Sequence, residues 1–96
     1  MQQEELFRQL SDLYKMFADS TRLRILCALQ EGEKCVSEIT QQLDMTQSAI
    51  SHQLSTLRQS HLVKTRREGR TIYYSLDDEH VAMILSMGVD HVLEKA

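Results

Sequence analysis

The chain contains no proline and no tryptophan, and its 96 residues include only three glycines and two cysteines. Without proline and with so little glycine, a mostly helical domain is favoured over a sandwich, a barrel or a disordered chain. Cys27 and Cys35 are too few to form the disulfide framework of a small secreted protein. No apolar run approaches the roughly eighteen residues that a membrane span requires, so we expect no membrane partner.

Hydrophobic residues make up 42% of the sequence, which is enough for one small domain over residues 1–96. A domain of this size buries a modest fraction of its surface when it folds alone, and a dimer would bury more. The first ten residues are polar and acidic and lack the apolar core of a signal peptide. The expected compartment is therefore the cytoplasm.

Apolar residues recur at helical spacing through the first half of the chain and predict three helices. The first ends near Ala18, and Asp19 and Ser20 supply N-cap chemistry for the second, which stops at Gly32. The second helix has the widest apolar stripe, which indicates a position in the core. The stripes are Leu6, Leu10, Leu13 and Phe17 in the first helix, Leu23, Ile25, Leu26, Cys27 and Leu29 in the second, and Val36, Ile39 and Leu43 in the third.

A tight turn at residues 44–46 leads into a fourth helix, whose apolar stripe is Ile50, Leu54 and Leu57. Two short helices across a three-residue turn have the spacing of a helix-turn-helix. Because the stripe faces inward, the polar residues near the start of the fourth helix face solvent, where a recognition helix reads base edges. The other interpretation is an ordinary solvated face. The candidate DNA-reading residues are Gln47, Ser48, Ser51 and His52.

After His61 the apolar pattern changes to period two, with Val63 and Thr65 in one run, a bend at Glu68 and Gly69, and a second run of Ile72, Tyr74 and Leu76. This pattern predicts a β-hairpin. The net charge of the chain is −3, yet residues 46–76 alone carry +4, which leaves −7 for the rest. A local basic surface of this kind suits DNA, although charges also protect an exposed sheet edge. The hairpin's candidate phosphate contacts are Lys64, Arg66, Arg67 and Arg70.

A fifth helix begins near Asp78, and nothing that follows in the sequence can cover its apolar stripe. Packing against a second copy of the chain is the natural solution. The stripe consists of Val81, Ile84, Leu85, Gly88 and Val92.

The same helix carries four good zinc ligands in the pattern D-x-H, ten residues, H-x-x-E: Asp78, His80, His91 and Glu94. His80 and His91 are separated by roughly 16 Å along a helix axis, whereas each ligand of a tetrahedral zinc site lies about 2 Å from the metal. One chain therefore cannot close the site. An antiparallel partner helix would bring His80 opposite His91 of the second chain and make two equivalent sites per dimer. The alternative is that Asp78 is only a helix cap and the other three are surface residues.

Three segments, "ADSTRLRILCAL", "TQSAISHQLSTLRQSHLVKTRREGRTIYYSL" and "DDEHVAMILSMGVDHVLE", resemble the ArsR/SmtB family of bacterial metal-sensing repressors across nearly the whole chain. The resemblance implies a homodimeric winged helix-turn-helix that binds double-stranded operator DNA without metal and is released when metal binds. Release would allow expression of metal efflux or sequestration genes. In the branch with ligands on the last helix the metal is Zn(II), often Co(II) too, held by Asp78 and His80 of one subunit with His91 and Glu94 of the other.

A second family site uses a C-V-C core on the third helix for softer ions. Here that core reads Cys35, Val36, Ser37, so one thiolate remains where two or more are needed. Four protein ligands leave no open position for a reactive water, so we do not expect an enzyme. Two alternatives remain: a repressor that lacks metal sensing or answers to thiol oxidation through Cys27 or Cys35, and a dimeric interaction module in which zinc is structural.

Overall fold

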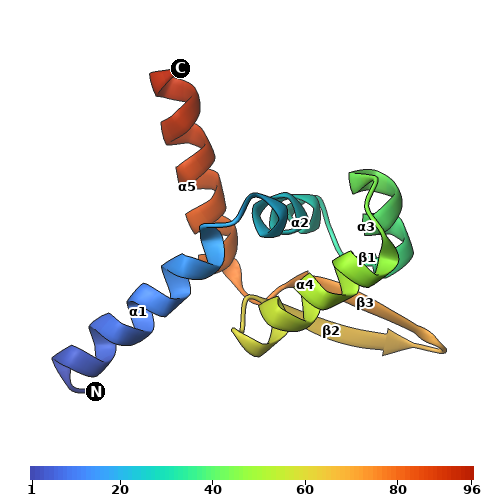
Figure 1. The fold of residues 1–96 in the computed structure, drawn as a ribbon, viewed down its shortest axis with the longest axis horizontal. Helices are drawn as coiled ribbons and strands as arrows, with labels where there is room; N and C mark the ends of the chain where they lie inside the picture. Colours follow the sequence, from blue (N-terminus) through green and yellow to red (C-terminus); the bar gives the residue numbers. More distant parts are fainter.

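Five α-helices and a three-stranded sheet account for nearly all of the chain, whose 96 residues are described by a computed structural model. Figure 1 shows that α1 and α5 point outward from a body formed by the other elements. None of the helices combines the length and apolarity needed to cross a membrane. In chain order the elements are α1 (Gln3–Phe17), α2 (Ser20–Gln30), β1 (Lys34–Cys35), α3 (Val36–Leu43), α4 (Gln47–Gln59), β2 (Val63–Glu68), β3 (Thr71–Leu76) and α5 (Glu79–Lys95).

Short polar side chains cap the N-termini of α2 and α4. The Asp19 carboxylate accepts a hydrogen bond from the Arg22 backbone N–H at 2.9 Å, and the Thr46 hydroxyl accepts one from Ala49 at 3.2 Å. Asp44 adopts the left-handed conformation, φ 53°, and ends α3. The predicted helix-turn-helix is therefore confirmed, with α3 and α4 joined by residues 44–46.

Two arginines of α2 donate hydrogen bonds to carbonyls at the C-terminal ends of neighbouring helices. The Arg22 guanidinium donates to the carbonyls of Lys15 and Met16 at the end of α1. The Arg24 guanidinium donates to the carbonyl of Leu43, the last residue of α3, at 3.2 Å. Because the last carbonyls of a helix lack partners within it, these contacts fix α1 and α3 to α2.

The sheet has the order β1-β3-β2, with antiparallel pairing throughout. The hairpin was predicted, but its bend was placed one residue early: Glu68 pairs with Thr71, and the loop is Gly69 and Arg70. Gly69 has a φ of 62°, which a residue with a side chain rarely adopts at the first position of a two-residue hairpin loop. The sequence did not reveal β1, because two residues are too few to show a period.

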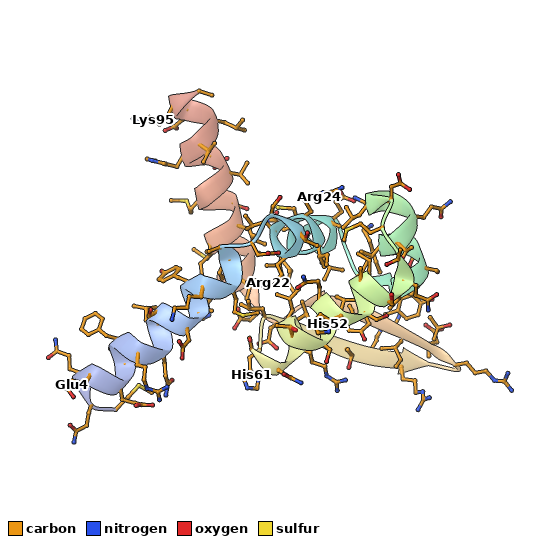
Figure 2. The ribbon with its side chains drawn as sticks, viewed as in Figure 1. Glu4, Arg22, Arg24, His52, His61 and Lys95 are labelled. Carbon is orange, nitrogen blue, oxygen red and sulfur yellow. The ribbon has the colours of Figure 1, made fainter.

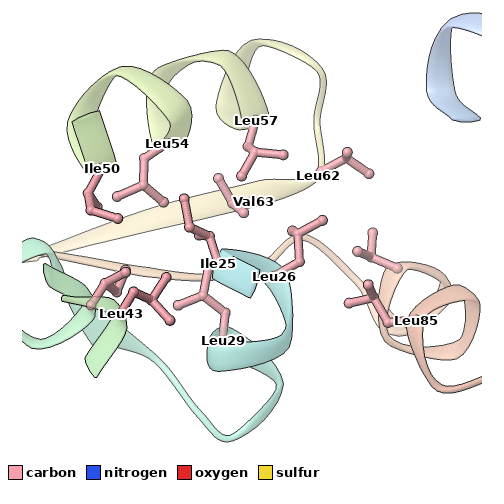
Figure 3. Packing of buried hydrophobic residues seen from close by; sticks show 12 residues of the cluster. Ile25, Leu26, Leu29, Leu43, Ile50, Leu54, Leu57, Leu62, Val63 and Leu85 are labelled. Carbon is pink, nitrogen blue, oxygen red and sulfur yellow. The ribbon is translucent and has the colours of Figure 1, made fainter. Parts of the chain in front are cut away.

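The core lies between α2, α4 and the inner face of the sheet. Figure 3 shows the apolar side chains of α4 directed toward α2, with Leu62 and Val63 beside them. Because Ile50, Leu54 and Leu57 of α4 are buried, the opposite face of this helix points to solvent. The core cluster is Ile25, Leu26, Leu29, Ile39, Leu43, Ile50, Leu54, Leu57, Leu62, Val63, Val81 and Leu85.

The two outward helices leave much of their apolar surface uncovered. No residue of α1 is buried, and α5 contributes only Val81 and Leu85 to the core. Beyond Leu85, Val92 remains 66% exposed. Monomeric soluble proteins rarely expose so many large apolar side chains on adjoining elements. The exposed ones on these helices are Leu6, Phe7, Leu10, Tyr14, Met83, Met87, Val89, Val92 and Leu93.

Replacing Leu54 with alanine should destabilise the protein by about 2–5 kcal/mol, because this fully buried side chain of α4 would leave a cavity facing α2. Ser55→Ala, on the exposed face of the same turn, should change stability by no more than about 0.5 kcal/mol. Urea denaturation at one fixed protein concentration measures both, since dimerisation would otherwise shift the midpoint. Equal stability of the two variants would contradict this description of the core.

Candidate DNA interface and metal ligands

The predicted reading residues of α4 share one exposed face. Ile50, Leu54 and Leu57 point into the core, while Gln47, Ser48, Ser51 and His52 are all solvent-exposed. His52 lies near the middle of α4 (Figure 2). Ser55 continues the same face, and the sequence could have indicated it from its spacing of three and four residues after His52 and Ser51.

The start of α4 favours an anion. Thr46 caps this end, and no acidic residue occurs in the first turn. The unpaired N–H groups and partial positive charge of a helix N-terminus attract phosphate. The end of α4 that carries Gln47 and Ser48 is therefore suited to a nucleic-acid backbone as well as to base edges.

The basic residues of the hairpin fall into two groups. Lys64, Arg67 and Arg70 are exposed and take part in none of the ion pairs within the chain. Arg66 is already engaged: its Nε lies 3.0 and 2.9 Å from the two carboxylate oxygens of Glu33, and its Nη1 lies 2.9 Å from Glu68. Three free cations thus remain on the hairpin.

Arg66 lies in a small network on the sheet's outer face. Its guanidinium carbon is 4.8 Å from the centre of the Tyr73 ring, within cation–π range. Hydrogen bonds from Arg66 hold the pKa of the Glu33 carboxyl below its usual value, and the two carboxylates raise the pKa of Arg66. Its role as a DNA contact stays a prediction, and any phosphate would have to compete with Glu33 and Glu68.

The first two candidate metal ligands lie together at the start of α5. The Asp78 carboxylate caps the helix by accepting a hydrogen bond from the Val81 N–H at 3.1 Å, and its other oxygen lies 3.5 Å from His80 Nδ1. The Val81 N–H and then the nearby His80 lower the pKa of Asp78. The His80 side chain is 87% exposed, so both residues are accessible to an incoming ion.

The other two candidates, His91 and Glu94, are exposed near the far end of α5. They are three residues apart and share a face of the helix. No group of three histidine, cysteine, aspartate or glutamate side chains comes together within the single chain. The structure therefore brings Asp78 to His80 and leaves His91 and Glu94 apart from them. The donor types suit a borderline metal, and the complete site stays a prediction that requires a second chain.

The two cysteines have different surroundings. Cys27 contributes to an apolar groove of about 360 Å³ between α2 and α5, also lined by Leu23 and Leu85, and burial raises the pKa of its thiol. A raised pKa keeps the less reactive protonated form. Cys35 precedes α3, with its Sγ 3.2 Å from Ser37 Oγ. The apolar surroundings of Cys27 agree with its interpretation as a packing residue.

Comparison with known proteins identifies the family. Residues 19–65, which span α2, β1, α3, α4 and the start of β2, match the model of the bacterial regulatory proteins of the arsR family. A transcriptional repressor SmtB homolog from Synechocystis is 41% identical over 91% of this chain, and the match covers 66% of that relative. The chain belongs to the ArsR family. A cadmium resistance transcriptional regulatory protein CadC homolog from Staphylococcus aureus is 36% identical over 88% of this chain and 70% of its own length.

This ArsR-family chain also shares its fold with solved structures. The homodimeric winged helix-turn-helix DNA-binding domain of Mb0332 from Mycobacterium bovis superposes with a TM-score of 0.87 at 32% identity, covering 98% of this chain and 86% of that one. The predicted winged helix-turn-helix is therefore confirmed, with β2 and β3 as the wing. Because its relatives are transcriptional regulators, the expectation that the chain is not an enzyme is also confirmed.

Two substitutions at Asp78 separate its capping role from its charge. Asn caps helices as well as Asp does, so Asp78→Asn should keep a melting temperature near that of wild type at pH 7, whereas Asp78→Ala should lower it. The lowered pKa of Asp78 means that its contribution is complete above the unfolded value of about 3.9 and is lost as pH falls through the folded value. Wild type should therefore lose stability relative to Asp78→Asn between about pH 5 and pH 3. Thermal unfolding across this range measures the difference, and identical pH profiles would argue against a charged cap.

Proposed function

We propose that this ArsR-family protein is a homodimeric transcriptional repressor that binds double-stranded operator DNA without metal and leaves it when Zn(II), or Co(II), binds between the two α5 helices. Release would allow expression of genes for metal efflux or sequestration. The observation that carries the proposal is the division of four metal ligands into two pairs at opposite ends of one exposed helix.

The dimer follows from what α1 and α5 leave uncovered. The exposed Val89, Val92 and Leu93 of α5 line, together with Leu23, Cys27 and Leu85, a groove whose surface is almost wholly apolar. A second copy of α5 running in the opposite direction would cover this surface. The same arrangement would place His91 and Glu94 of the partner subunit near Asp78 and His80. The homodimeric state of the related Mb0332 domain supports a dimer.

In such a dimer the two α4 helices read DNA. The face with Ser51 and His52 would enter the major groove from its N-terminal end, and the wing would contact flanking phosphates through Lys64, Arg67 and Arg70. Successive major grooves on one side of DNA lie about 34 Å apart, so the two recognition helices must keep that separation. Any movement of one subunit against the other changes the separation and lowers affinity.

The proposed ligands are two imidazoles and two carboxylates. Nitrogen and oxygen donors favour zinc or cobalt over softer ions such as cadmium, which prefer thiolates. The only cysteine at the start of α3 is Cys35, which contacts a serine rather than a second thiol. The Staphylococcus aureus relative is named for cadmium resistance. This chain has no matching pair of thiolate ligands at the start of α3.

A backbone contact connects the metal ligands to the recognition helix. The Asp77 N–H donates to the carbonyl of Leu62 at 3.0 Å, extending the hairpin ladder by one bond. Asp77 precedes the ligand Asp78, and Leu62 lies three residues after the end of α4. When Asp78 and His80 are drawn toward the partner helix, this junction moves with them and carries α4 out of register with DNA. A coupling of about 1–3 kcal/mol between the sites is enough for such control.

A repressor that responds to thiol oxidation is the second candidate. Burial raises the pKa of the Cys27 thiol and lowers its reactivity, which argues against this cysteine as the sensor. An oxidant titrated into the same DNA-binding assay as zinc distinguishes the two. Release by oxidant and not by zinc would favour the thiol mechanism.

Substituting His91→Ala should leave operator affinity within about twofold of wild type but abolish zinc-induced release, which in coupled systems is typically about 5- to 150-fold. His91 lies far from α4 and supplies one of four ligands, so only the response to metal should change. Fluorescence anisotropy with labelled DNA, with and without zinc, measures both affinities.

The matched control is His61→Asn, which removes another exposed histidine. His61 has a φ of 60°, and asparagine tolerates that conformation. This variant should keep zinc-induced release. Normal zinc-induced release by His91→Ala, or a monomeric wild-type protein, would refute the proposed metal site.

Removing one phosphate contact should change the salt dependence of DNA binding. Arg70→Gln, at the loop of the wing, should reduce the slope of log affinity against log salt by about 0.9. Lys95→Gln at the end of α5 makes the same change in charge far from the wing and should leave the slope unchanged (Figure 2). A flat slope for wild type would instead support a protein-interaction module with structural zinc.

A further inference from the structure

The wing of this protein is unevenly supported along its length. The short strand β1 pairs with β3 only at Tyr73 and Tyr74. The outer part of the hairpin, residues 67–72, is therefore a two-stranded ribbon without a third strand, as Figure 1 shows. Isolated two-stranded ribbons are marginally stable and twist readily. Yet this part carries Arg67 and Arg70, two of the three free cations.

One side-chain network joins β2 and β3 to the residue before β1 at the point where this ribbon begins. Arg66 of β2 lies over the ring of Tyr73 of β3 and reaches the carboxylate of Glu33, next to β1. Tyr73 is the direct partner of both Arg66 and Cys35 in the sheet. Val63 and Tyr74 pack toward the core, so by alternation Arg66 and Tyr73 occupy the opposite face.

The charge balance of the network argues against a direct DNA contact by Arg66. Glu33 and Glu68 both bind its guanidinium, so the positive charge has two negative partners. A phosphate would have to displace one of them. The contact with Glu33 uses two guanidinium nitrogens against both carboxylate oxygens, which gives it a defined direction.

We propose that Glu33 and Arg66 form a latch that sets the direction of the wing, and that Arg66 is a positioning residue rather than a phosphate contact. This role rests on the proposed DNA-binding function. The latch fixes the root of the ribbon to the body through Glu33. Arg67 and Arg70, beyond the latch, are thereby held where they meet the DNA backbone.

The sign of the effect of Glu33→Gln tests the latch. Removing a negative charge near DNA should strengthen binding if only the overall charge matters. The latch predicts the reverse: Glu33→Gln and Arg66→Gln should each weaken binding about two- to fivefold, as expected for an exposed ion pair. The double variant should be no weaker than either single variant, because both break the same contact. Affinities are measured on a duplex of about 30 base pairs, selected by the wild-type protein from a random pool to include two half-sites.

The salt dependence of DNA affinity distinguishes a phosphate contact from the latch. Arg66→Gln should leave the slope of log affinity against log salt unchanged, whereas the matched control Arg67→Gln should lower it by about 0.9. The charge exchange Glu33→Arg with Arg66→Glu keeps the net charge and should recover most of the wild-type affinity. Far-UV circular dichroism confirms that each variant is folded.

The outcomes distinguish the latch from the function on which it rests. Tighter binding by Glu33→Gln, or a slope for Arg66→Gln that falls as far as that of Arg67→Gln, overturns the latch while DNA binding stands. Failure of the charge exchange to recover affinity also overturns it. If the wild-type protein selects no duplex, the proposed function fails and the latch fails with it.

Discussion

The packing of α4 against α2 is the contact on which the other features depend. Ile50, Leu54 and Leu57 are fully buried on one side of α4, and Ile25 and Leu26 receive them. With this stripe inside, the polar face of the same helix must point to solvent, and its capped N-terminus stays free for an anion. A recognition surface therefore results from core packing before any DNA is present. The wing then takes its place from Leu62 and Val63, which extend the same core into the sheet.

Unlike α4, helix α5 has two features that a single chain does not complete: its apolar surface and its candidate metal site. Its apolar surface beyond Leu85 has no cover, and its two pairs of candidate ligands are too far apart to share one ion. One partner helix would resolve both deficits, which is why we connect metal binding to the dimer rather than to the stability of one domain. The hydrogen bond from the Asp77 N–H to the Leu62 carbonyl joins the segment before α5 to the segment that follows α4.

Features determined by local sequence could be predicted, and those that depend on distant contacts could not. The predicted helix ends near Ala18, Ser20, Gly32 and Asp78 agree with the structure to within two residues. Such ends can be predicted because a cap such as Asp19 or Asp78 acts on a backbone group three residues away. The strand β1 was not predicted, because its two residues are defined as a strand only by their pairing with β3. Among the candidate site residues, those on the exposed face of α4 could be predicted, because helical periodicity alone defines which residues share that face. Arg66 was grouped with the other hairpin cations, because no local pattern shows that Glu33 lies beside it.

The distinction between Arg66 and its neighbours changes how the basic surface works. A count of charges gives the region around α4 and the wing an excess of +4 in a chain whose net charge is −3. Because two carboxylates bind Arg66, the unpaired cations of this region are Arg58 at the end of α4 and Lys64, Arg67 and Arg70 on the hairpin. Fewer free cations weaken nonspecific binding to any duplex, since that binding scales with the phosphates neutralised. A regulator that leaves its site when metal binds, as proposed here, would benefit from this, because the base contacts proposed for α4 would then carry a larger share of its affinity. Loss of their register alone would then be enough for release.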